Sequence, residues 1–327
     1  MTVSREQWAA QVQDHRDEEG RVFRYVHVRH PGSRGLVVHF SAFFGEWGDA
    51  RAYRKVFSGH FHRLRMLGEV TDHDWLFVCD EYGADDNGTY YSGHAGDRFV
   101  ERAMLALIMS IAGSSGVDAS SIVTVGSSMG ATGALKFGLL LGVKGIVAIS
   151  PHIDLDICAV RQGRWRHVAY ICPDGDPVAA YNEIYTRQIR HLVVDRPAGS
   201  LPQLFVQSCR DDDGVFSEQV EPLCREWRAR GGAVALDARA RGGHTSDHAT
   251  KPLLLDVITR LLDGDAIDVR RYQRDRRFRG SAASVGLVRR LRSTGGRALR
   301  RAGLRRRPEE PDGGTEDRMP SEPSIQG

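Results

Sequence analysis

One stretch of the sequence, Ser121–Gly138 (SIVTVGSSMGATGALKFG), constrains the fold more than any other. It begins with a short apolar, β-branched run, turns at GSSMG and continues as small and apolar residues with helical character. This pattern predicts a strand, a tight turn centred on Ser128 and a helix. Gly126 and Gly130 suit a nucleophile elbow, because side chains at these positions would crowd a sharp strand-to-helix turn. Ser128 is therefore the candidate nucleophile.

Taken alone, the G-x-S-x-G pattern is a weak signal, because the chain has 36 glycines among 327 residues. A purely structural glycine-rich turn would look the same. Gly126, Gly130 and Gly133 also loosely imitate the phosphate loop of a dinucleotide-binding domain. Such a loop normally opens its domain, whereas this one follows roughly 120 residues. The rest of the chain has to supply the partners that a nucleophile needs.

Apolar strand-like segments alternate with helix-like segments through most of the chain. Because strands buried on both faces are apolar throughout, this alternation predicts an α/β fold with a doubly wound, mainly parallel sheet. The expected strands are Arg21–Arg29, Gly35–Phe40, Trp75–Cys79, Ile122–Val125, Gly145–Ile149, Leu204–Ser208 and Ala233–Leu236. The expected helices are Ala50–Leu67, Asp97–Ala112, the segment after the elbow, Ser217–Arg230 and His248–Leu262.

Pro151–Pro202 interrupts this alternation and is interpreted as a cap or insertion over the sheet. It separates the half of the domain that carries the elbow from the half that carries the later strands. Within it, His167–Cys172 (HVAYIC) is expected to add a strand, and Ala179–Leu192 is expected to form a polar helix.

Composition and charge divide the chain into segments. Residues 1–20 are expected to form an N-terminal extension and residues 21–264 the main domain, with the insertion at about 151–202. Between Arg270 and Arg307 there are 15 arginines and one acidic residue, so residues 265–307 are expected to form a basic tail. Residues 308–327 carry six acidic residues and one arginine, which predicts an acidic disordered tail.

The basic tail leaves three alternatives open. It could contact an anionic membrane through an amphipathic helix, bind a polyanion nonspecifically, or remain solvated and disordered. No specific nucleic-acid partner is expected. No apolar run approaches the roughly 18 residues that cross a bilayer, and the start shows no secretory signal. The five scattered cysteines favour buried reduced thiols, so we expect a cytoplasmic protein. If the basic tail contacts an anionic membrane, the protein would be peripheral to the inner membrane face.

A nucleophilic serine needs a base to take its proton and a carboxylate to orient that base. In a parallel sheet these groups come from loops at the carboxyl ends of other strands. One such loop contains Asp211, Asp212 and Asp213, and a later loop contains His244 and His248. His244 is the candidate base, because His248 is expected to open the last helix. Asp212 is the candidate acid with Asp211 as the alternate, since spacing alone does not choose between them.

An oxyanion hole needs two N–H donors. One is expected from Met129, directly after the serine, and the other from Ser41 or Ala42, in the loop after an earlier strand. The aromatic residues of that loop, Phe43, Phe44 and Trp47, would form a pocket wall or pack under the insertion. We expect neither a metal nor a cofactor. The histidine pairs His60/His62 and His244/His248 have suitable spacings for a metal but lack an acidic partner pattern.

The GSSMG elbow, the DDDGV acid loop and the GGHTS histidine loop together resemble the α/β-hydrolases over about Arg21–Leu262. More narrowly, HFSAFF, CDEYGADDNGTYY, GSSMGATGALKFG and SPHIDLD resemble the XcbB/CpsF-type capsular polysaccharide biosynthesis proteins and the accessory-Sec glycan O-acetyltransferase subunit. This resemblance implies a cytoplasmic protein that acts on sugar polymers and moves acetyl groups. Tyr82, Tyr90 and His152 follow strands and would border the pocket, where they could bind sugar hydroxyls, although His152 could equally be a local cap.

The leading hypothesis from the sequence is a serine acyl-ester enzyme, either an esterase or an O-acyltransferase, acting on a cell-surface or capsular glycan or another small acyl ester. Ser128 would attack, His244 would act as base and Asp212 would orient it. These residues do not separate the two reactions, which differ in whether water or a sugar hydroxyl reaches the acyl-enzyme. The alternative is a non-catalytic α/β-hydrolase-like assembly protein in glycan biosynthesis or export.

Overall fold

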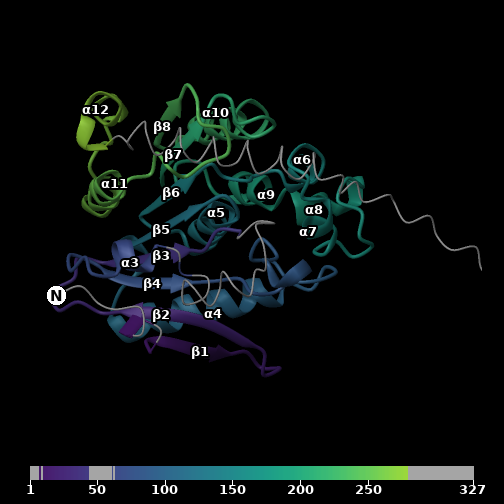
Figure 1. Ribbon diagram of the computed structural model, residues 1–327, viewed down its shortest axis with the longest axis horizontal. Coiled ribbons are helices and arrows are strands. Elements are labelled where there is room, and N and C mark those ends of the chain that lie inside the picture. Colours follow the sequence, from purple (N-terminus) through teal and green to yellow (C-terminus); the bar gives the residue numbers. More distant parts are fainter. Residues whose placement is uncertain (1–6, 9, 44–60, 62, 279–327) are drawn as a thin grey trace, which may run out of the picture. The chain divides into compact units, whose positions relative to one another are not determined.

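A computed structural model describes residues 7–8, 10–43, 61 and 63–278 of the chain (Figure 1). Its described part is built on one eight-stranded sheet with the strand order β1-β2-β4-β3-β5-β6-β7-β8. The strands are β1 (Val12–Arg16), β2 (Val22–Val28), β3 (Leu36–Phe40), β4 (Asp74–Val78), β5 (Ile122–Ser127), β6 (Gly145–Ile149), β7 (Gln203–Cys209) and β8 (Val234–Arg239). The six strands β4, β3, β5, β6, β7 and β8 run parallel to one another. At one edge, β2 pairs antiparallel with β4, and β1 pairs antiparallel with β2. The predicted α/β fold is confirmed.

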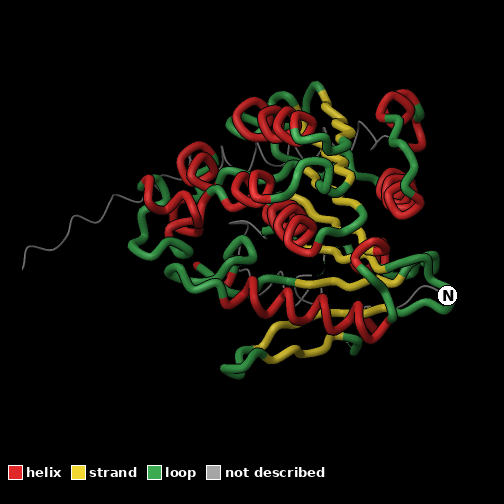
Figure 2. The backbone as a smooth tube through the Cα atoms, turned by 180° about the vertical axis from the view of Figure 1, so that it is seen from behind, coloured by secondary structure: helices red, strands yellow, loops and turns green. Residues whose placement is uncertain are grey.

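The helices lie on both sides of this sheet (Figure 2). They are α3 (Leu64–Leu67), α4 (Phe99–Ser115), α5 (Met129–Leu141), α6 (Leu155–Arg161), α7 (Trp165–Ala169), α8 (Glu183–Thr186), α9 (Gln188–Asp195), α10 (Glu221–Ala229), α11 (Lys251–Asp263) and α12 (Val269–Arg274). Within the described residues, no helix is both long and apolar enough to cross a membrane.

Successive strand residues face two separate apolar layers. In β3, Val38 packs in the layer that contains α4, α5 and α10, whereas its neighbour Val37 packs in the layer that contains α3 and α11. Val123 and Val147, on β5 and β6, also face the α11 layer. Burial on both faces explains why the central strands are apolar throughout instead of alternating with polar residues.

The main domain was expected to span residues 21–264. The sheet begins before residue 21, and the folded part continues beyond residue 264. Val12–Arg16, within the expected N-terminal extension, forms β1 and pairs with β2. At the other end, α12 brings Tyr272 into the α11 layer, where its side chain is fully buried and its hydroxyl donates to Asp256 at 2.6 Å. Residues 279–327, which hold the rest of the basic tail and the acidic tail, lie outside the described residues, so the membrane contact stays a prediction.

The insertion is helical where one strand was expected. His167–Cys172 does not pair with the sheet: it comprises the end of α7 and the turn after it, because Val168, Ile171 and Cys172 share the 3–4 spacing of a buried helical face. The expected polar helix at Ala179–Leu192 is broken into a 3₁₀ turn (Ala180–Asn182), α8 and α9. Helices α6, α7 and α8 lie together at one end of the sheet (Figure 1).

Two other helix boundaries differ from the prediction. The helix expected to open at His248, α11, begins at Lys251, because Thr250 caps it by accepting the Leu253 amide at 3.4 Å. The segment predicted as Ser217–Arg230 starts with a π-helical turn (Phe216–Val220) before α10. Of the helix expected at Ala50–Leu67, only α3 falls within the described residues.

Two buried charged side chains hold the loop that follows β4. Asp80 accepts hydrogen bonds from the amides of Thr89 and Tyr91 at 2.6 and 2.8 Å. From the other side, Lys136 on α5 donates to the Ser92 hydroxyl at 2.6 Å and to the carbonyl oxygen of Tyr91 at 3.1 Å. Both charged residues are 1% exposed. Because buried charges are costly unless satisfied, this network ties the loop at 80–92 firmly to the sheet and to α5.

Replacing Lys136 with methionine should change how stability depends on pH. Burial lowers the pKa of Lys136 from 10.5 to about 8. At this side chain the unfolded chain therefore binds more protons than the folded chain between about pH 8 and 10.5, so the contribution of Lys136 to the free energy of unfolding should rise with pH in this window. Relative to Lys136→Met, the rise should total about 3 kcal/mol. Denaturant unfolding of both proteins from pH 7.5 to 10.5 measures it, and a difference that stays flat would contradict the assignment.

Candidate active site

Ser128 occupies a strained turn between β5 and α5. Its backbone dihedrals are φ 54° and ψ −122°, a conformation that costs a non-glycine residue roughly 1–3 kcal/mol. The Ser128 amide donates to the carbonyl oxygen of Ile149 at 2.9 Å, which fixes the turn against β6. Ser127 is buried, whereas Ser128 is partly exposed. The strand, turn and helix predicted from the sequence are all present, with Ser128 at the apex.

The glycines on either side of Ser128 are required by close backbone approach. A Cβ atom on Gly126 would lie 2.0 Å from the carbonyl oxygen of Gly130. A Cβ atom on Gly130 would lie 2.3 Å from the carbonyl oxygen of Phe40 at the end of β3. Both clashes are with backbone atoms, which cannot move aside as a flexible side chain can. The elbow can therefore form only with glycine at both positions.

His244 connects Ser128 to Asp212 by two hydrogen bonds. Its Nε2 lies 2.8 Å from the Ser128 hydroxyl oxygen, and its Nδ1 lies 2.9 Å from Oδ2 of Asp212. Since a carboxylate can only accept, Nδ1 carries the proton and Nε2 accepts from the serine hydroxyl. Asp212 follows β7 and its side chain is 2% exposed, whereas the side chain of His244, in the loop after β8, is 25% exposed.

The three neighbouring aspartates, Asp211, Asp212 and Asp213, have different contacts. Their spacing in the sequence could not show which of them contacts His244. Asp212 contacts His244, whereas Asp211 accepts from the amides of Gly242 and Gly243 at 3.2 and 2.8 Å and so holds the histidine loop. The Asp213 side chain is 84% exposed. The other histidine of that loop, His248, places its Nε2 3.2 Å from the carbonyl oxygen of Arg241.

One of the expected oxyanion donors is ruled out. The Ser41 amide donates to the carbonyl oxygen of Val78 at 3.1 Å, because the pairing of β3 with β4 continues one residue past the strand end. Ala42, the next residue, lies beyond this pairing and keeps the predicted role. Met129 is the first residue of α5, and an amide in this position has no acceptor within its own helix. Of the expected aromatic wall, Phe44 and Trp47 lie outside the described residues.

Phe43 is the described member of that aromatic wall. Its ring makes an edge-to-face contact with His167 of α7, with ring centroids 4.5 Å apart. The Arg164 guanidinium lies over the same ring at 4.4 Å. The residue next to the expected oxyanion donor Ala42 is thus packed against the insertion.

The three residues expected to bind sugar hydroxyls lie in different surroundings. Tyr82 sits beside β2, where its hydroxyl donates to the carbonyl oxygen of Val22 at 2.9 Å. Tyr90 and His152 are each 1% exposed, and the Tyr90 hydroxyl lies 3.3 Å from Nδ1 of His152. The His152 ring stacks on the ring of His244. The Tyr82 hydroxyl is thus engaged by β2, whereas Tyr90 and His152 are buried.

Two buried charged residues behind this site, Asp80 and Lys136, are absent from the residues predicted from the sequence. Lys136 does leave a signal, because it is a lone charged residue in an otherwise small and apolar helical run, GATGALKFG. No signal identifies Asp80 among the acidic residues of its loop.

The prediction that the protein binds no metal involves two histidine pairs, of which only His244 and His248 lie within the described residues. No cluster of three or more His, Cys, Asp or Glu side chains suited to a metal occurs in the described residues. His60 and His62 lie outside them.

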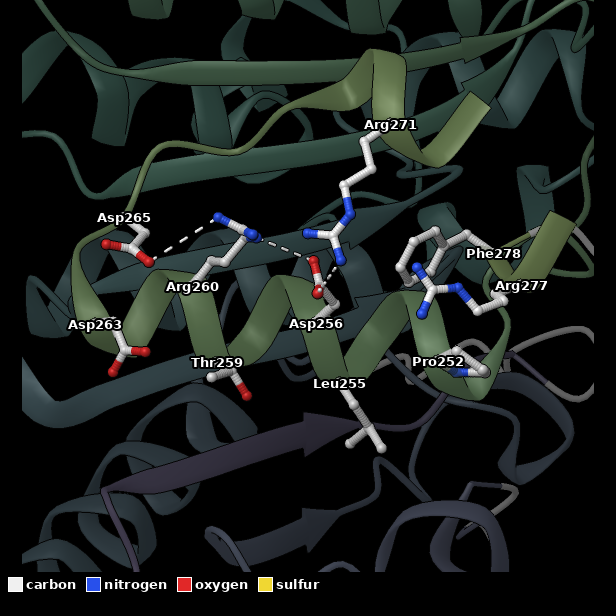
Figure 3. Close-up of a pocket in the computed structure, with 10 residues that line it drawn as sticks. All are labelled: Pro252, Leu255, Asp256, Thr259, Arg260, Asp263, Asp265, Arg271, Arg277 and Phe278. Carbon is white, nitrogen blue, oxygen red and sulfur yellow. Dashed lines mark hydrogen bonds and ion pairs between the residues drawn. The ribbon is translucent and has the colours of Figure 1, made fainter. Parts of the chain in front are cut away.

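A pocket away from Ser128 lies along α11 (Figure 3). It is lined by Pro252, Leu255, Asp256, Thr259, Arg260, Asp263, Asp265, Arg271, Arg277 and Phe278. Its acidic and basic side chains pair with one another: Asp256 is 3.0 Å from Arg260 and 3.3 Å from Arg271. Because these charges neutralise each other, the pocket offers no excess charge to a ligand, and the elbow remains the candidate active site.

No family model and no curated protein sequence matches this chain. Solved structures do match. The capsule O-acetyltransferase of Neisseria meningitidis serogroup A has a TM-score of 0.55 at 17% identity, covering 77% of this chain and 99% of that one. An arylesterase has a TM-score of 0.52 at 17% identity, covering 77% of this chain and 83% of that one.

The glycosylation-associated Gap123 complex from Streptococcus agalactiae has a TM-score of 0.55 at 14% identity. The match covers 78% of this chain but only 45% of the Gap123 chain, so this chain spans less than half of that relative. These likenesses, together with the sheet order and the elbow, show that the chain has the α/β-hydrolase fold. The capsule and glycosylation proteins are of the kinds that the sequence segments resemble.

Substituting alanine for Gly130 should destabilise the protein strongly. The new Cβ would lie 2.3 and 2.8 Å from the carbonyl oxygens of Phe40 and Ser41, which forces the elbow away from β3 at a cost of roughly 3 kcal/mol. Gly113→Ala is the matched control, because Gly113 lies within α4 and its new Cβ would meet nothing within 4 Å. That change should stabilise the helix by up to about 1 kcal/mol. Equal unfolding midpoints for the two variants would contradict this account.

Proposed function

We propose that this protein is a serine acyl-ester enzyme, an esterase or O-acyltransferase, in which Ser128 is the nucleophile. The observation that carries the proposal is the hydrogen-bonded line from Asp212 through His244 to Ser128 at the elbow of an α/β-hydrolase fold. Nucleophile, orienting acid and base follow one another in the chain as Ser128, Asp212 and His244, the order of that fold.

In the first half of the proposed reaction, the Ser128 hydroxyl oxygen attacks the carbonyl carbon of an acyl ester. His244 takes the hydroxyl proton on Nε2, and Asp212 stabilises the resulting imidazolium through Nδ1. The amides of Met129 and Ala42 would stabilise the oxyanion of the tetrahedral intermediate. When the intermediate collapses, the bond to the alcohol breaks, His244 returns the proton to the leaving oxygen, and an acyl-Ser128 ester remains.

The second half of the reaction transfers the acyl group to a hydroxyl. Water or a sugar hydroxyl attacks the acyl-Ser128 carbonyl, and His244 takes the proton of the attacking group. Collapse then restores the Ser128 hydroxyl by returning that proton. Water gives a carboxylic acid and hence an esterase, whereas a sugar hydroxyl gives an acylated sugar and hence an O-acyltransferase.

A glycan is the substrate class that we propose. Two structural neighbours support it: one is named as a capsule O-acetyltransferase, and the other is named as glycosylation-associated. The sequence segments that resemble capsular polysaccharide biosynthesis proteins point the same way. The Gap123 likeness also keeps the alternative of a non-catalytic assembly protein, which would use the fold without the nucleophile.

A fluorophosphonate probe should label the wild-type protein at Ser128, because an activated serine attacks phosphorus as it attacks an acyl carbon. Ser128→Ala should abolish labelling. Asp212→Asn should slow it by about 10⁴-fold, since an amide would favour the wrong tautomer of His244. Labelling rates followed by mass spectrometry of the Ser128 peptide measure both effects.

The neighbouring Asp213→Asn is the matched control for Asp212→Asn, because it neutralises an adjacent carboxylate whose side chain is 84% exposed. It should label at the wild-type rate. If the wild-type protein is not labelled under conditions that label a known esterase, the enzyme proposal is wrong. Glycan formation that survives Ser128→Ala but not deletion of the whole protein would establish the assembly alternative.

The fate of the acyl group should separate the two reactions. With p-nitrophenyl acetate as donor, wild-type protein should carry an acetyl group on Ser128. If a glycan is the natural acceptor, added oligosaccharide should be O-acetylated at the expense of free acetate. Mass spectrometry of the sugar and titration of acetate measure this partition. Acetate alone at every sugar concentration would assign the protein as an esterase.

A further inference from the structure

The two hydrogen bonds of His244 leave one degree of freedom unconstrained. They act at opposite sides of the ring, with Asp212 at Nδ1 and Ser128 at Nε2. The ring can therefore turn about the line joining these atoms while the hydrogen bonds are only weakened. Asp211 and Ser150 hold the histidine loop only through its backbone, at Gly242, Gly243 and Thr245, so the plane of the His244 ring depends on what its side chain contacts.

A second imidazole ring supplies the missing constraint. The His152 ring lies parallel to the His244 ring, with centroids 4.6 Å apart and an angle of 19° between the planes. His152 is 1% exposed. We propose that His152 is a positioning residue, a flat wall that holds the plane of the His244 ring so that Nε2 stays aimed at Ser128. This inference rests on the proposed serine chemistry.

The position of His152 is itself set from several sides. Its carbonyl oxygen accepts from the Thr132 hydroxyl at 2.6 Å, and its Nδ1 lies 3.3 Å from the Tyr90 hydroxyl. Two residues earlier, the Ser150 hydroxyl donates to the carbonyl oxygen of Thr245 at 2.9 Å. The segment after β6 thus holds the histidine loop by a backbone contact beside His244 and by the stacked ring.

Tyr90 belongs to the loop that Asp80 and Lys136 hold. Its φ of 54° is unusual for a residue with a side chain, and the hydrogen bonds to the neighbouring Thr89, Tyr91 and Ser92 maintain it. The buried charges, the Tyr90 hydroxyl, the His152 ring and the His244 ring form a continuous set of contacts. This set connects the buried network to the candidate site.

His152 has to stay neutral, because a second positive charge beside His244 would oppose the protonation of that base. Burial lowers the pKa of His152 well below its ordinary 6.5, and its electrostatic interactions with His244 and Arg164 lower it further. His152 therefore stays uncharged when His244 takes the serine proton, and no second cation faces the imidazolium. Its Nε2 is buried without a hydrogen-bond partner in the described residues, so the flat ring and not this nitrogen makes the contact.

The test compares two apolar substitutions that differ in shape. His152→Phe keeps a flat ring, whereas His152→Leu fills the space without one. In fluorophosphonate labelling, we expect the leucine variant to have a maximal rate constant at least about 10-fold below wild type with unchanged probe affinity, because the base is misplaced while binding is not. The phenylalanine variant should stay within about threefold of wild type. The loss in the leucine variant should be constant from pH 6 to 9, since His152 does not titrate there.

His191→Leu, on the exposed surface of α9, is the matched control and should label as wild type does. Thermal unfolding of each variant shows whether it is folded. A folded leucine variant that labels at the wild-type rate would overturn the inference, as would a folded phenylalanine variant as slow as the leucine one, or a loss that varies with pH. If wild-type protein itself is not labelled, the proposed function fails together with the inference, whereas labelling of wild type and leucine variant alike refutes the inference alone.

Discussion

The close approach of three backbone segments at the elbow is the constraint on which the rest of the site depends. The turn at Ser128 passes so near the end of β3 that Gly130 has room for no side chain against the Phe40 carbonyl oxygen. The same approach puts the first amide of α5 beside the loop that begins at Ser41. The segments that carry the candidate nucleophile and the two proposed oxyanion donors thus meet because β3 and β5 are parallel neighbours.

The proposed base and acid come from the other half of the sheet. β7 and β8 are parallel neighbours, so the loops after them start at the same edge, and Asp212 and His244 meet across 2.9 Å although 32 residues separate them. Asp211 reinforces this meeting by binding the backbone of the histidine loop. Adjacent carboxylates therefore divide the work: one faces the imidazole, and the other shapes the loop that carries it.

Much of the fold and the main line of the site could be predicted from the sequence, because both follow from local patterns. The apolar strands, the glycines around Ser128 and the loops that end at Asp212 and His244 are visible without a structure. Predictions failed where a short segment was compatible with two structures, or where one backbone amide had two possible acceptors. His167–Cys172 is apolar enough for a strand, but its buried face is helical, and Ser41 lost the oxyanion role because its amide is used by β4.

By itself, the sequence determined the α/β class, the elbow and the position of Ser128 at its apex, since these depend on periodicity and on glycine at two positions. Only the tertiary structure decided which aspartate faces His244 and that His152 stacks on it. It also decided that Asp80 and Lys136 support the loop behind them. Such contacts join residues far apart in the chain, where spacing carries no information, and they are set by how the loops after separate strands pack at one edge of the sheet.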